Sequence, residues 1–169
     1  MTAKEPVDKV LVGLLGYCGL RIGEAVHLRL NWIREGEIHI PSTMACNCFE
    51  CYERGFWKPK SKAGSRIVPI PGFLVGTIVD YFTKFPDGFR MPRQSGWYRI
   101  QKLVKEAGLP KAFPHSLRAT YATLLATKGM QAVAICYLLG WARLEVAQHY
   151  VRVAQAREQA KKQIKEIWG

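Results

Sequence analysis

The strand-like part of this sequence is confined to one window, residues 37–71, and this confinement strongly limits the possible folds. Three short segments rich in β-branched and aromatic residues lie in it, separated by turn signals: Ile38–Ile40, Phe56–Trp57 and Arg66–Ile70. On both sides of the window, apolar residues recur with helical spacing. The pattern predicts an α+β fold that is mainly α-helical, with a small antiparallel sheet of about three strands between helices.

The helical pattern divides at glycine and proline signals into separate elements. The first helix is expected over Val7–Tyr17, and a second is expected from near Arg21, with Ile22, Val26 and Leu30 on its apolar side. Later helices are expected at Phe73–Phe82, at Trp97–Ala107, after Pro114, at Ala132–Leu139 and from about Val153.

The chain is strongly basic. Its 169 residues include 25 Lys and Arg against 13 Asp and Glu, a net charge of +12, while 49% of the residues are hydrophobic. This combination favours a folded domain whose partner is a polyanion such as nucleic acid. Because no run of about 18 uncharged apolar residues and no signal-peptide pattern occurs, we expect a cytoplasmic, DNA-associated protein rather than a membrane protein.

Three of the five cysteines are clustered in the strand-like window. Cys46, Cys48 and Cys51 form a C-x-C-x2-C pattern, which is compatible with a structural zinc site that uses a fourth ligand such as His39. The same pattern also allows one disulfide or a thiol-rich surface loop. Only three sulfurs are local, whereas structural zinc usually takes four ligands, so the surface loop is the preferred interpretation.

Residues suited to phosphoryl transfer occur in order along the chain. Arg21 and Glu24 lie three positions apart, His115 and Arg118 do the same, and Tyr150 follows downstream. They supply a phenol nucleophile, two guanidinium groups for a phosphate and a proton donor. Each also has an ordinary structural explanation, since an i, i+3 helix pair contributes only about 0.2–0.5 kcal/mol and is common. The ordered set, rather than any one member, indicates a site.

These motifs resemble those of the tyrosine recombinases, the family of phage and archaeal-virus integrases and chromosome-dimer resolvases. Cys18-Gly-Leu-Arg-Ile-Gly-Glu24 is similar to the family's first arginine box, and His115-Ser-Leu-Arg118-Ala-Thr120 to its second. Leu139-Gly-Trp141 resembles the element that normally precedes the nucleophile by nine residues, as it precedes Tyr150 here. Ala119 departs from the family's common second histidine. The resemblance covers nearly the whole chain.

The resemblance implies a role for each motif residue. Tyr150 would be the nucleophile, Arg21 and Arg118 would bind the scissile phosphate, His115 would assist proton transfer, and Trp141 would donate its indole N–H or pack against the site. Losing one such phosphate donor costs about 3–4 kcal/mol by analogy with oxyanion holes.

Two further positions come from the same resemblance. The segment Lys60-Ser-Lys62-Ala-Gly-Ser-Arg66-Ile-Val-Pro69 is similar to the hairpin that bears the family's catalytic lysine. Alignment favours Lys60 as the acid that protonates the leaving 5′ oxygen, with Lys62 as the alternative, and Glu24 would support Arg21.

Basic residues on this hairpin, in the loop near residue 90 and on the following helix are suited to contact DNA phosphates. The predicted contacts are Lys58, Lys62, Arg66, Arg90, Arg93, Arg99 and Lys102.

The function implied by the resemblance is site-specific DNA recombination through a 3′-phosphotyrosine intermediate, without metal or ATP, by a homo-oligomer, expected to be a tetramer, on double-stranded DNA. About twenty residues precede Arg21, so residues 1–169 are expected to be a single catalytic domain that lacks the family's N-terminal core-binding domain. The terminal helix, 153–169, is expected either to close its own core or to dock onto a neighbouring subunit.

Three alternatives remain open at this point. A type IB topoisomerase uses a similar residue set to relax supercoils, and a non-catalytic DNA-binding module would retain the basic surface alone. The third is a zinc-organised interaction domain built on Cys46, Cys48 and Cys51.

Overall fold

The computed structural model of the chain describes residues 5–110 and 112–169. The helices are α1 (Pro6–Gly16), α2 (Ile22–His27), α3 (Gly72–Lys84), α4 (Arg93–Glu106), α5 (Pro114–Thr127), α6 (Ala132–Leu138) and α7 (Leu144–Trp168), and the strands are β1 (Ile33–Arg34), β2 (Glu37–Ile40), β3 (Met44–Ala45), β4 (Phe56–Trp57) and β5 (Arg66–Pro69). The predicted class, mainly helical with a short strand region between helices, is confirmed. No described helix is both long and apolar enough to span a membrane.

The strands form two small antiparallel sheets rather than one. The larger has the order β1-β2-β5, with Ile38 opposite Val68, and in the smaller β3 pairs with β4, with Met44 opposite Trp57. The predicted strand at Phe56–Trp57 therefore belongs to the smaller sheet, and the third strand of the larger sheet is β1. Strand β1 has no signal in the sequence, because two residues are too short to show alternation.

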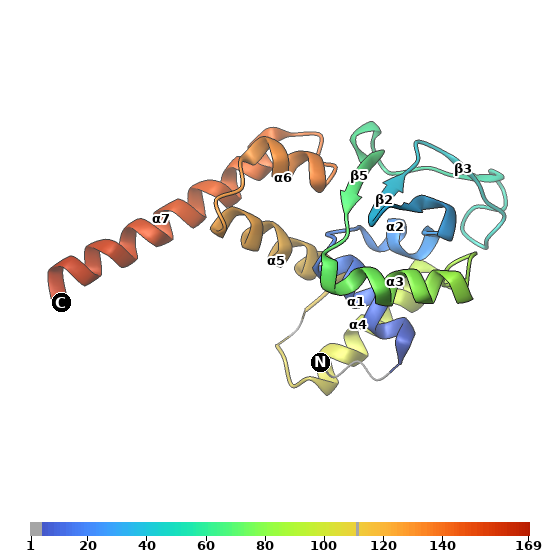
Figure 1. Cartoon of the computed structure of the whole chain (residues 1–169), viewed down its shortest axis with the longest axis horizontal. Coiled ribbons are helices and arrows are strands. Elements are labelled where there is room, and N and C mark those ends of the chain that lie inside the picture. Colours follow the sequence, from blue (N-terminus) through green and yellow to red (C-terminus); the bar gives the residue numbers. More distant parts are fainter. Residues whose placement is uncertain (1–4, 111) are drawn as a thin grey trace.

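Two apolar cores lie side by side and meet where the candidate residues gather. The larger core packs α1 to α4 with the strands, around the fully buried Leu11, Leu14 and Ile38. The smaller core lies between α5, α6 and α7, around Ile135 and Leu139. Figure 1 shows α5, α6 and α7 together on one side and the strands on the other. Residues from both halves can therefore share one site.

Helix α2 is shorter than its apolar pattern predicts. It ends at His27 because Leu28 has an extended backbone (φ −61°, ψ 136°), and Leu30 lies in a separate 3-10 helix, Leu30–Trp32. The short helix holds Arg21 at its N-cap and His27 at its last position. Its two ends thus carry two of the side chains discussed below.

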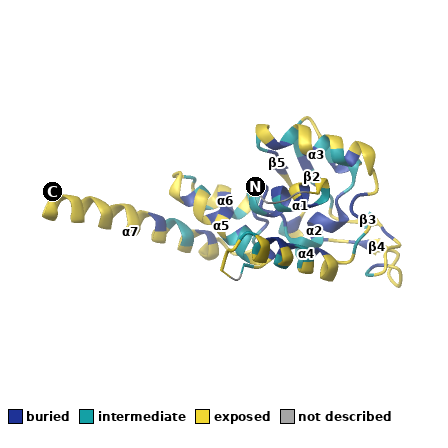
Figure 2. Cartoon of the chain, turned by 90° about the horizontal axis from the view of Figure 1, so that it is seen from below, coloured by how far each residue is buried: buried dark blue, intermediate teal, exposed yellow. Residues whose placement is uncertain are grey.

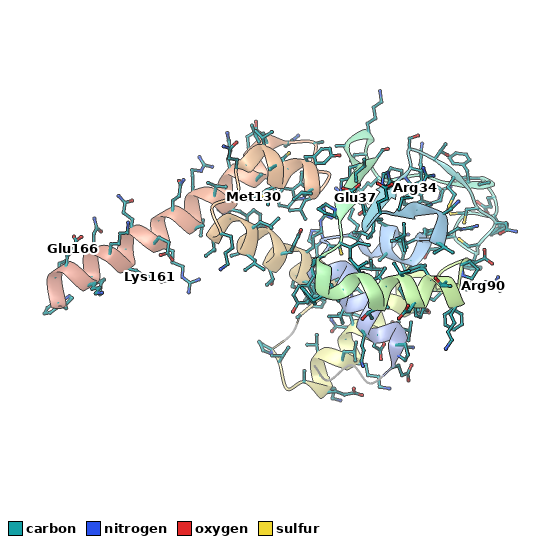
Figure 3. The ribbon with its side chains drawn as sticks, in the orientation of Figure 1. Arg34, Glu37, Arg90, Met130, Lys161 and Glu166 are labelled. Atoms are coloured by element: carbon teal, nitrogen blue, oxygen red, sulfur yellow. The ribbon has the colours of Figure 1, made fainter. Side chains whose placement is uncertain are left out.

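Helix α7 is one continuous element of 25 residues, whereas the sequence analysis expected a separate terminal helix from Val153. Ala147 and Ala154 are its buried residues, and beyond Ala154 every residue is exposed, as Figure 2 shows. Lys161 and Glu166 stand out along this projecting part (Figure 3). Among the described residues, nothing covers the large apolar side chains of this segment, Val153, Ile164, Ile167 and Trp168, so they do not close the chain's own core.

Candidate active site

A cleft of about 610 Å³ opens between the start of α2, the segment after β4 and the start of α5. Its lining includes Arg21, Lys60, His115 and Arg118, four of the six residues to which the resemblance gives a catalytic role. They come from positions spread over nearly a hundred residues. The fold therefore brings together the groups that the sequence motifs single out.

Arg21 is held at the edge of this cleft by an adjacent carboxylate. Its Nη1 donates to Oε1 of Glu24 at 2.8 Å, and its backbone N–H donates to Oε2 at 2.9 Å, which caps the first turn of α2. The Arg21 side chain is 24% exposed, whereas that of Glu24 is 3% exposed. Glu24 therefore orients Arg21 from the buried side, while the guanidinium stays accessible from the cleft.

Arg66 lies beneath the site as a buried partner of the same carboxylate. Its Nη1 and Nη2 donate to the two oxygens of Glu24, both at 3.0 Å, in a bidentate pair, and its side chain is 0% exposed. Arg66 also donates to the carbonyl of Gly64 at 2.8 Å. The structure contradicts the predicted DNA contact from Arg66, because the guanidinium is enclosed and its donors are occupied.

The carbonyls at the end of α6 and in the turn that follows it are bound by arginines. The carbonyls of residues 138–140 accept hydrogen bonds from Arg66, Arg118 and Arg21, in that order. Such carbonyls lack helical partners and carry the negative end of the helix dipole, so cations stabilise them. The turn before Trp141 is thereby tied to both of the arginines predicted to bind phosphate.

Two motif glycines are required by close backbone approach. Gly19 (φ +63°) and Gly140 (φ +55°) both have the left-handed conformation that favours glycine. A Cβ on Gly19 would lie 2.5 Å from the ring of Tyr121, and one on Gly140 would lie 2.7 Å from the carbonyl oxygen of Ala63. Each glycine therefore allows a tight turn next to one of the site arginines.

Tyr150 is linked to Arg118 through Trp141. The rings of Tyr150 and Trp141 stack with centroids 5.5 Å apart and an interplanar angle of 18°, and the guanidinium carbon of Arg118 lies 5.9 Å from the Trp141 centroid. Tyr150 is half-buried, and within the described residues neither aromatic side chain lines the cleft. The predicted nucleophile thus lies beside the arginine cluster rather than among the cleft residues.

The arginines are crowded enough to perturb one another. Burial first, and then the positive charge of Arg21, lower the pKa of the Arg118 guanidinium to about 9, while Glu24 and Tyr150 oppose the shift. Arg118 is buried, with donors on the carbonyls of Gly19 and Leu139. An incoming phosphate would relieve this repulsion between cations, so the cluster favours an anionic ligand.

Of the four catalytic candidates that line the cleft, Lys60 and His115 are exposed. Lys60 follows β4, and His115 lies in the first turn of α5 directly after Pro114, which begins the helix. Lys62, the alternative catalytic lysine, is exposed in the 3-10 helix Lys62–Gly64 and is not among the cleft residues that the structure describes. The placement favours Lys60 as the lysine of this site.

Of the remaining residues predicted to contact DNA, some line the cleft and others form ion pairs with carboxylates. Lys58 and Arg93 line the cleft, and Arg93 stays 61% exposed although its Nε donates to Glu50 at 2.8 Å. Arg90 pairs with Asp87 on the surface. Arg54, which the sequence analysis missed, also lines the cleft. These positions extend the positive surface around the site.

Arg99 and Lys102 lie on α4 away from these cleft residues. Arg99 makes ion pairs with both Asp8 and Glu5, and it is 32% exposed. The predicted phosphate contact from Arg99 is not supported, because two carboxylates already neutralise its charge. Lys102 lies 3.9 Å from Glu106 on an exposed face, an arrangement that contributes little by itself.

The cysteine loop meets His27 rather than His39. The ligand atoms of His27, Cys46, Cys48 and Cys51 all lie within 4.8 Å of one another, and all the cysteines are free thiols. His39 lies on β2, where its Nε2 is 3.4 Å from Oε2 of Glu37. The structure contradicts both His39 as the fourth ligand and the disulfide. His27 was missed because it lies about twenty residues before the cysteines, at the end of another element.

Acid should weaken the buried ion pairs under the cleft. Burial raises the pKa of Glu24, but the hydrogen bonds and charge of Arg66, together with the backbone N–H and charge of Arg21, outweigh it and hold the pKa below 4.5. A carboxylate whose pKa is depressed on folding stabilises the protein above its unfolded pKa, and the stabilisation is lost as pH falls through the folded value.

We therefore expect the free energy of unfolding, measured with urea across the acid range, to decrease as pH falls below about 4.5. In Glu24→Gln, which cannot ionise, this acid-side decrease should be smaller and the stability at neutral pH lower. Equal acid slopes in the two proteins would contradict the role given to Glu24.

Comparison with known proteins gives a consistent result. The profile described as the phage integrase family matches residues 2–157. The chain belongs to this family. Tyrosine recombinase XerD of Pseudomonas putida is 30% identical over 157 residues, covering 90% of this chain and 51% of XerD. Tyrosine recombinase XerA of Pyrococcus furiosus is 27% identical over 161 residues, covering 86% and 50%. The chain spans about half the length of the curated relatives it matches.

Solved structures of the family share the fold. The crystal structure of XerA recombinase superposes with a TM-score of 0.73 at 22% identity, covering 95% of this chain and 58% of that one. XerH recombinase bound to a palindromic difH substrate gives a TM-score of 0.67 at 20% identity, covering 98% and 48%. The mainly helical architecture around the cleft is therefore the architecture of this family's recombinases.

Proposed function

We propose that this domain cleaves and rejoins DNA strands as a site-specific recombinase, with Tyr150 as the nucleophile. The observation that carries the proposal is the convergence of Arg21, Lys60, His115 and Arg118 on one cleft, with Tyr150 stacked beside Arg118 through Trp141. Membership of the phage integrase family supports the same activity.

The reaction follows from the chemistry of these groups. The phenol oxygen of Tyr150 attacks the scissile phosphorus, the bond to the 5′ oxygen breaks, and a 3′-phosphotyrosine forms. Arg21 and Arg118 donate hydrogen bonds to the non-bridging oxygens as their negative charge grows. The phenol, whose reference pKa is about 10, gives up its proton with help from His115, and Lys60 supplies a proton to the leaving oxygen.

Rejoining is the reverse reaction with a new strand. The 5′ hydroxyl of a partner strand attacks the phosphotyrosine and gives its proton to Lys60, the bond to Tyr150 breaks, and the phenol recovers a proton with help from His115. Because the phosphodiester energy is stored in the covalent intermediate, neither ATP nor a metal is needed for this step. No cofactor is therefore assigned to the reaction.

A trapping experiment tests this function. A nicked duplex that releases its short 5′ fragment prevents rejoining and should leave the protein covalently attached to DNA, with the adduct mapped to Tyr150 by mass spectrometry. An adduct on another residue, or no adduct with duplexes that carry the recombination site of the DNA encoding this chain, would contradict the proposal. Relaxation of supercoiled plasmid without joining of two DNA partners would instead identify the topoisomerase alternative.

The choice between Lys60 and Lys62 can be decided by changing the leaving group. We expect Lys60→Ala to reduce cleavage by about 10²- to 10⁴-fold, as loss of a general acid does, and Lys62→Ala to reduce it far less. A substrate with sulfur in place of the bridging 5′ oxygen releases a thiolate that needs no proton. It should restore Lys60→Ala to near the wild-type rate, and failure to do so would rule out an acid role.

The proposed partner is double-stranded DNA, bound by the cleft and its basic surroundings in the cytoplasm, where a homo-oligomer would assemble. Lys58, Arg54 and Arg93 supply phosphate contacts next to the site. Their contribution to affinity should decline with rising salt, since it depends on release of counterions.

We also propose that residues 1–169 act as one catalytic domain whose C-terminal segment, 153–169, docks onto a neighbouring subunit. The support is the exposure of its large apolar side chains, which have no cover among the described residues. They are Val153, Ile164, Ile167 and Trp168, exposed by 53%, 58%, 67% and 80%.

A further inference from the structure

Four side chains with metal-binding atoms meet where the end of α2 touches the loop between β3 and β4. Nε2 of His27 lies 3.4 Å from Sγ of Cys48 and 3.5 Å from Sγ of Cys51, and Cys46 completes a group whose ligand atoms all lie within 4.8 Å. We propose that this group is a structural zinc site of the Cys₃His type. The proposal does not depend on the recombinase activity.

The spacing of the ligand atoms fits tetrahedral zinc. Zinc–sulfur bonds of about 2.3 Å and zinc–nitrogen bonds of about 2.0–2.1 Å place neighbouring nitrogen and sulfur atoms about 3.6 Å apart and neighbouring sulfurs about 3.8 Å apart. The two nitrogen–sulfur distances from His27 differ from this ideal by about 0.2 Å or less. These two distances therefore already match those that a bound zinc ion requires.

The orientation of His27 is that of a metal ligand. Its Nδ1 lies 2.7 Å from the carbonyl oxygen of Gly23, an acceptor, so Nδ1 carries the proton and donates it. The lone pair of Nε2 is then free and directed at the thiols of Cys48 and Cys51. Zinc-binding histidines usually donate their second ring nitrogen in this way, which fixes the tautomer and the ring orientation.

Charge around the cluster also suits the bound form. A zinc ion with three thiolates and a neutral imidazole has a net charge of about −1, the sum of +2 and −3. Nη2 of Arg29 lies 3.8 Å from Sγ of Cys46 and is placed to offset this charge. Sulfur-rich ligand sets of this kind select zinc over magnesium or calcium, which prefer oxygen ligands.

The loop is folded so that its cysteines face one point. The backbone N–H of Cys51 donates to the carbonyl of Cys48 at 2.8 Å, and the N–H of Cys46 donates to the carbonyl of Gly55 at 3.0 Å. Four protein ligands leave no open position for water, so the site is structural rather than catalytic. A solvated loop of thiols would not explain why a histidine from a separate helix completes the set.

The proposed zinc site lies between two segments that form the walls of the cleft. Helix α2 starts at Arg21 and ends at His27, and β4 ends at Trp57, which stacks on His27 with centroids 5.5 Å apart and leads to Lys60. Zinc would thus clamp the wall that carries Lys60 to the wall that carries Arg21. The metal would therefore fix the distance between the two sides of the cleft.

Metal analysis of the untagged full chain tests the proposal. After purification and dialysis we expect about one zinc per chain, retained against a weak chelator and released by a thiol-modifying reagent. Cys48→Ser should lose the retained zinc, whereas Cys136→Ser, which changes a half-buried cysteine outside the cluster, should keep it. His27→Ala should lose it as well, and His27→Cys, which restores a fourth soft ligand, should regain it.

Cobalt substitution provides a second readout that does not rely on stability. Co²⁺ exchanged into the site should show the absorption of a tetrahedral ion with thiolate-to-metal charge transfer, weakened in Cys48→Ser and unchanged in Cys136→Ser. Absence of zinc in wild-type protein refolded with zinc, equal zinc in Cys48→Ser and wild type, or an octahedral cobalt spectrum would each overturn the proposal. Trapping of DNA by Tyr150 is measured separately, so the two proposals can fail independently.

Discussion

Replacing Tyr150 with phenylalanine is expected to abolish the covalent DNA adduct and to reduce strand cleavage by at least about 10⁴-fold, the scale of nucleophile deletions. The substitution removes only the phenol oxygen. Phenylalanine retains the ring that stacks on Trp141 at 5.5 Å, so the fold and the position of Arg118 should be preserved. The measurements are adduct formation on the nicked duplex and DNA affinity under the same conditions.

Tyr17→Phe is the matched control. Tyr17 is 41% exposed and packs against Phe73, and its hydroxyl has no role in the proposed site. This variant should form the adduct at the wild-type rate. If Tyr150→Phe also formed an adduct at a comparable rate while binding DNA like the wild type, Tyr150 would not be the nucleophile proposed here.

Replacing Arg66 with alanine is expected to destabilise the protein by about 3–5 kcal/mol, the usual cost of removing one partner of a buried ion pair. The change leaves the carboxylate of Glu24 without its bidentate partner and removes the donors to Leu138 and Gly64. For a chain of this size the melting temperature should fall by roughly 6–20 °C. Urea unfolding and thermal melting measure the loss.

Arg34→Ala provides the comparison for Arg66→Ala. Arg34 is an exposed arginine on the edge strand β1, labelled in Figure 3, and its loss should change stability by less than about 0.5 kcal/mol. Comparing DNA binding by the two variants also tests whether Arg66 contacts DNA, as the sequence had predicted. If Arg66→Ala weakened DNA binding and lowered its salt dependence while the melting temperature stayed constant, Arg66 would be a phosphate contact after all.

The sequence predicted the order and type of the main elements because their apolar residues repeat with helical spacing. It failed where an element was too short or where no local signal marks a boundary. Strand β1 has two residues, and the end of α2 at His27 depends on the backbone of Leu28. The predicted terminal helix began only at about Val153 and so left out Tyr150, because nothing in the local sequence pattern shows that α7 is continuous from Leu144.

For the site, motif resemblance found the residues but could not assign their environments. Arg66 and Lys60 lie on the same predicted hairpin, yet one side chain is 0% exposed and the other is exposed at the cleft. Which of them faces solvent depends on how the hairpin packs against α6, a tertiary contact without a sequence signature. The same reason explains why His27 rather than His39 meets the cysteines, since residues distant in sequence become neighbours only in the fold.

The continuous helix that carries Tyr150 links this residue to the exposed C-terminal end of the chain. Its small buried contact at Ala154 lies four residues after Tyr150 and fourteen before Trp168, arms of about 6 Å and 21 Å at 1.5 Å per residue. A tilt about that contact that moved the exposed end by about 3.5 Å would move the phenol by about 1 Å, against the packing of Ala147 in the smaller core. A displacement of that size is large enough to change a reaction rate by about 100-fold. A partner that held the far end of α7 would therefore influence the position of the proposed nucleophile.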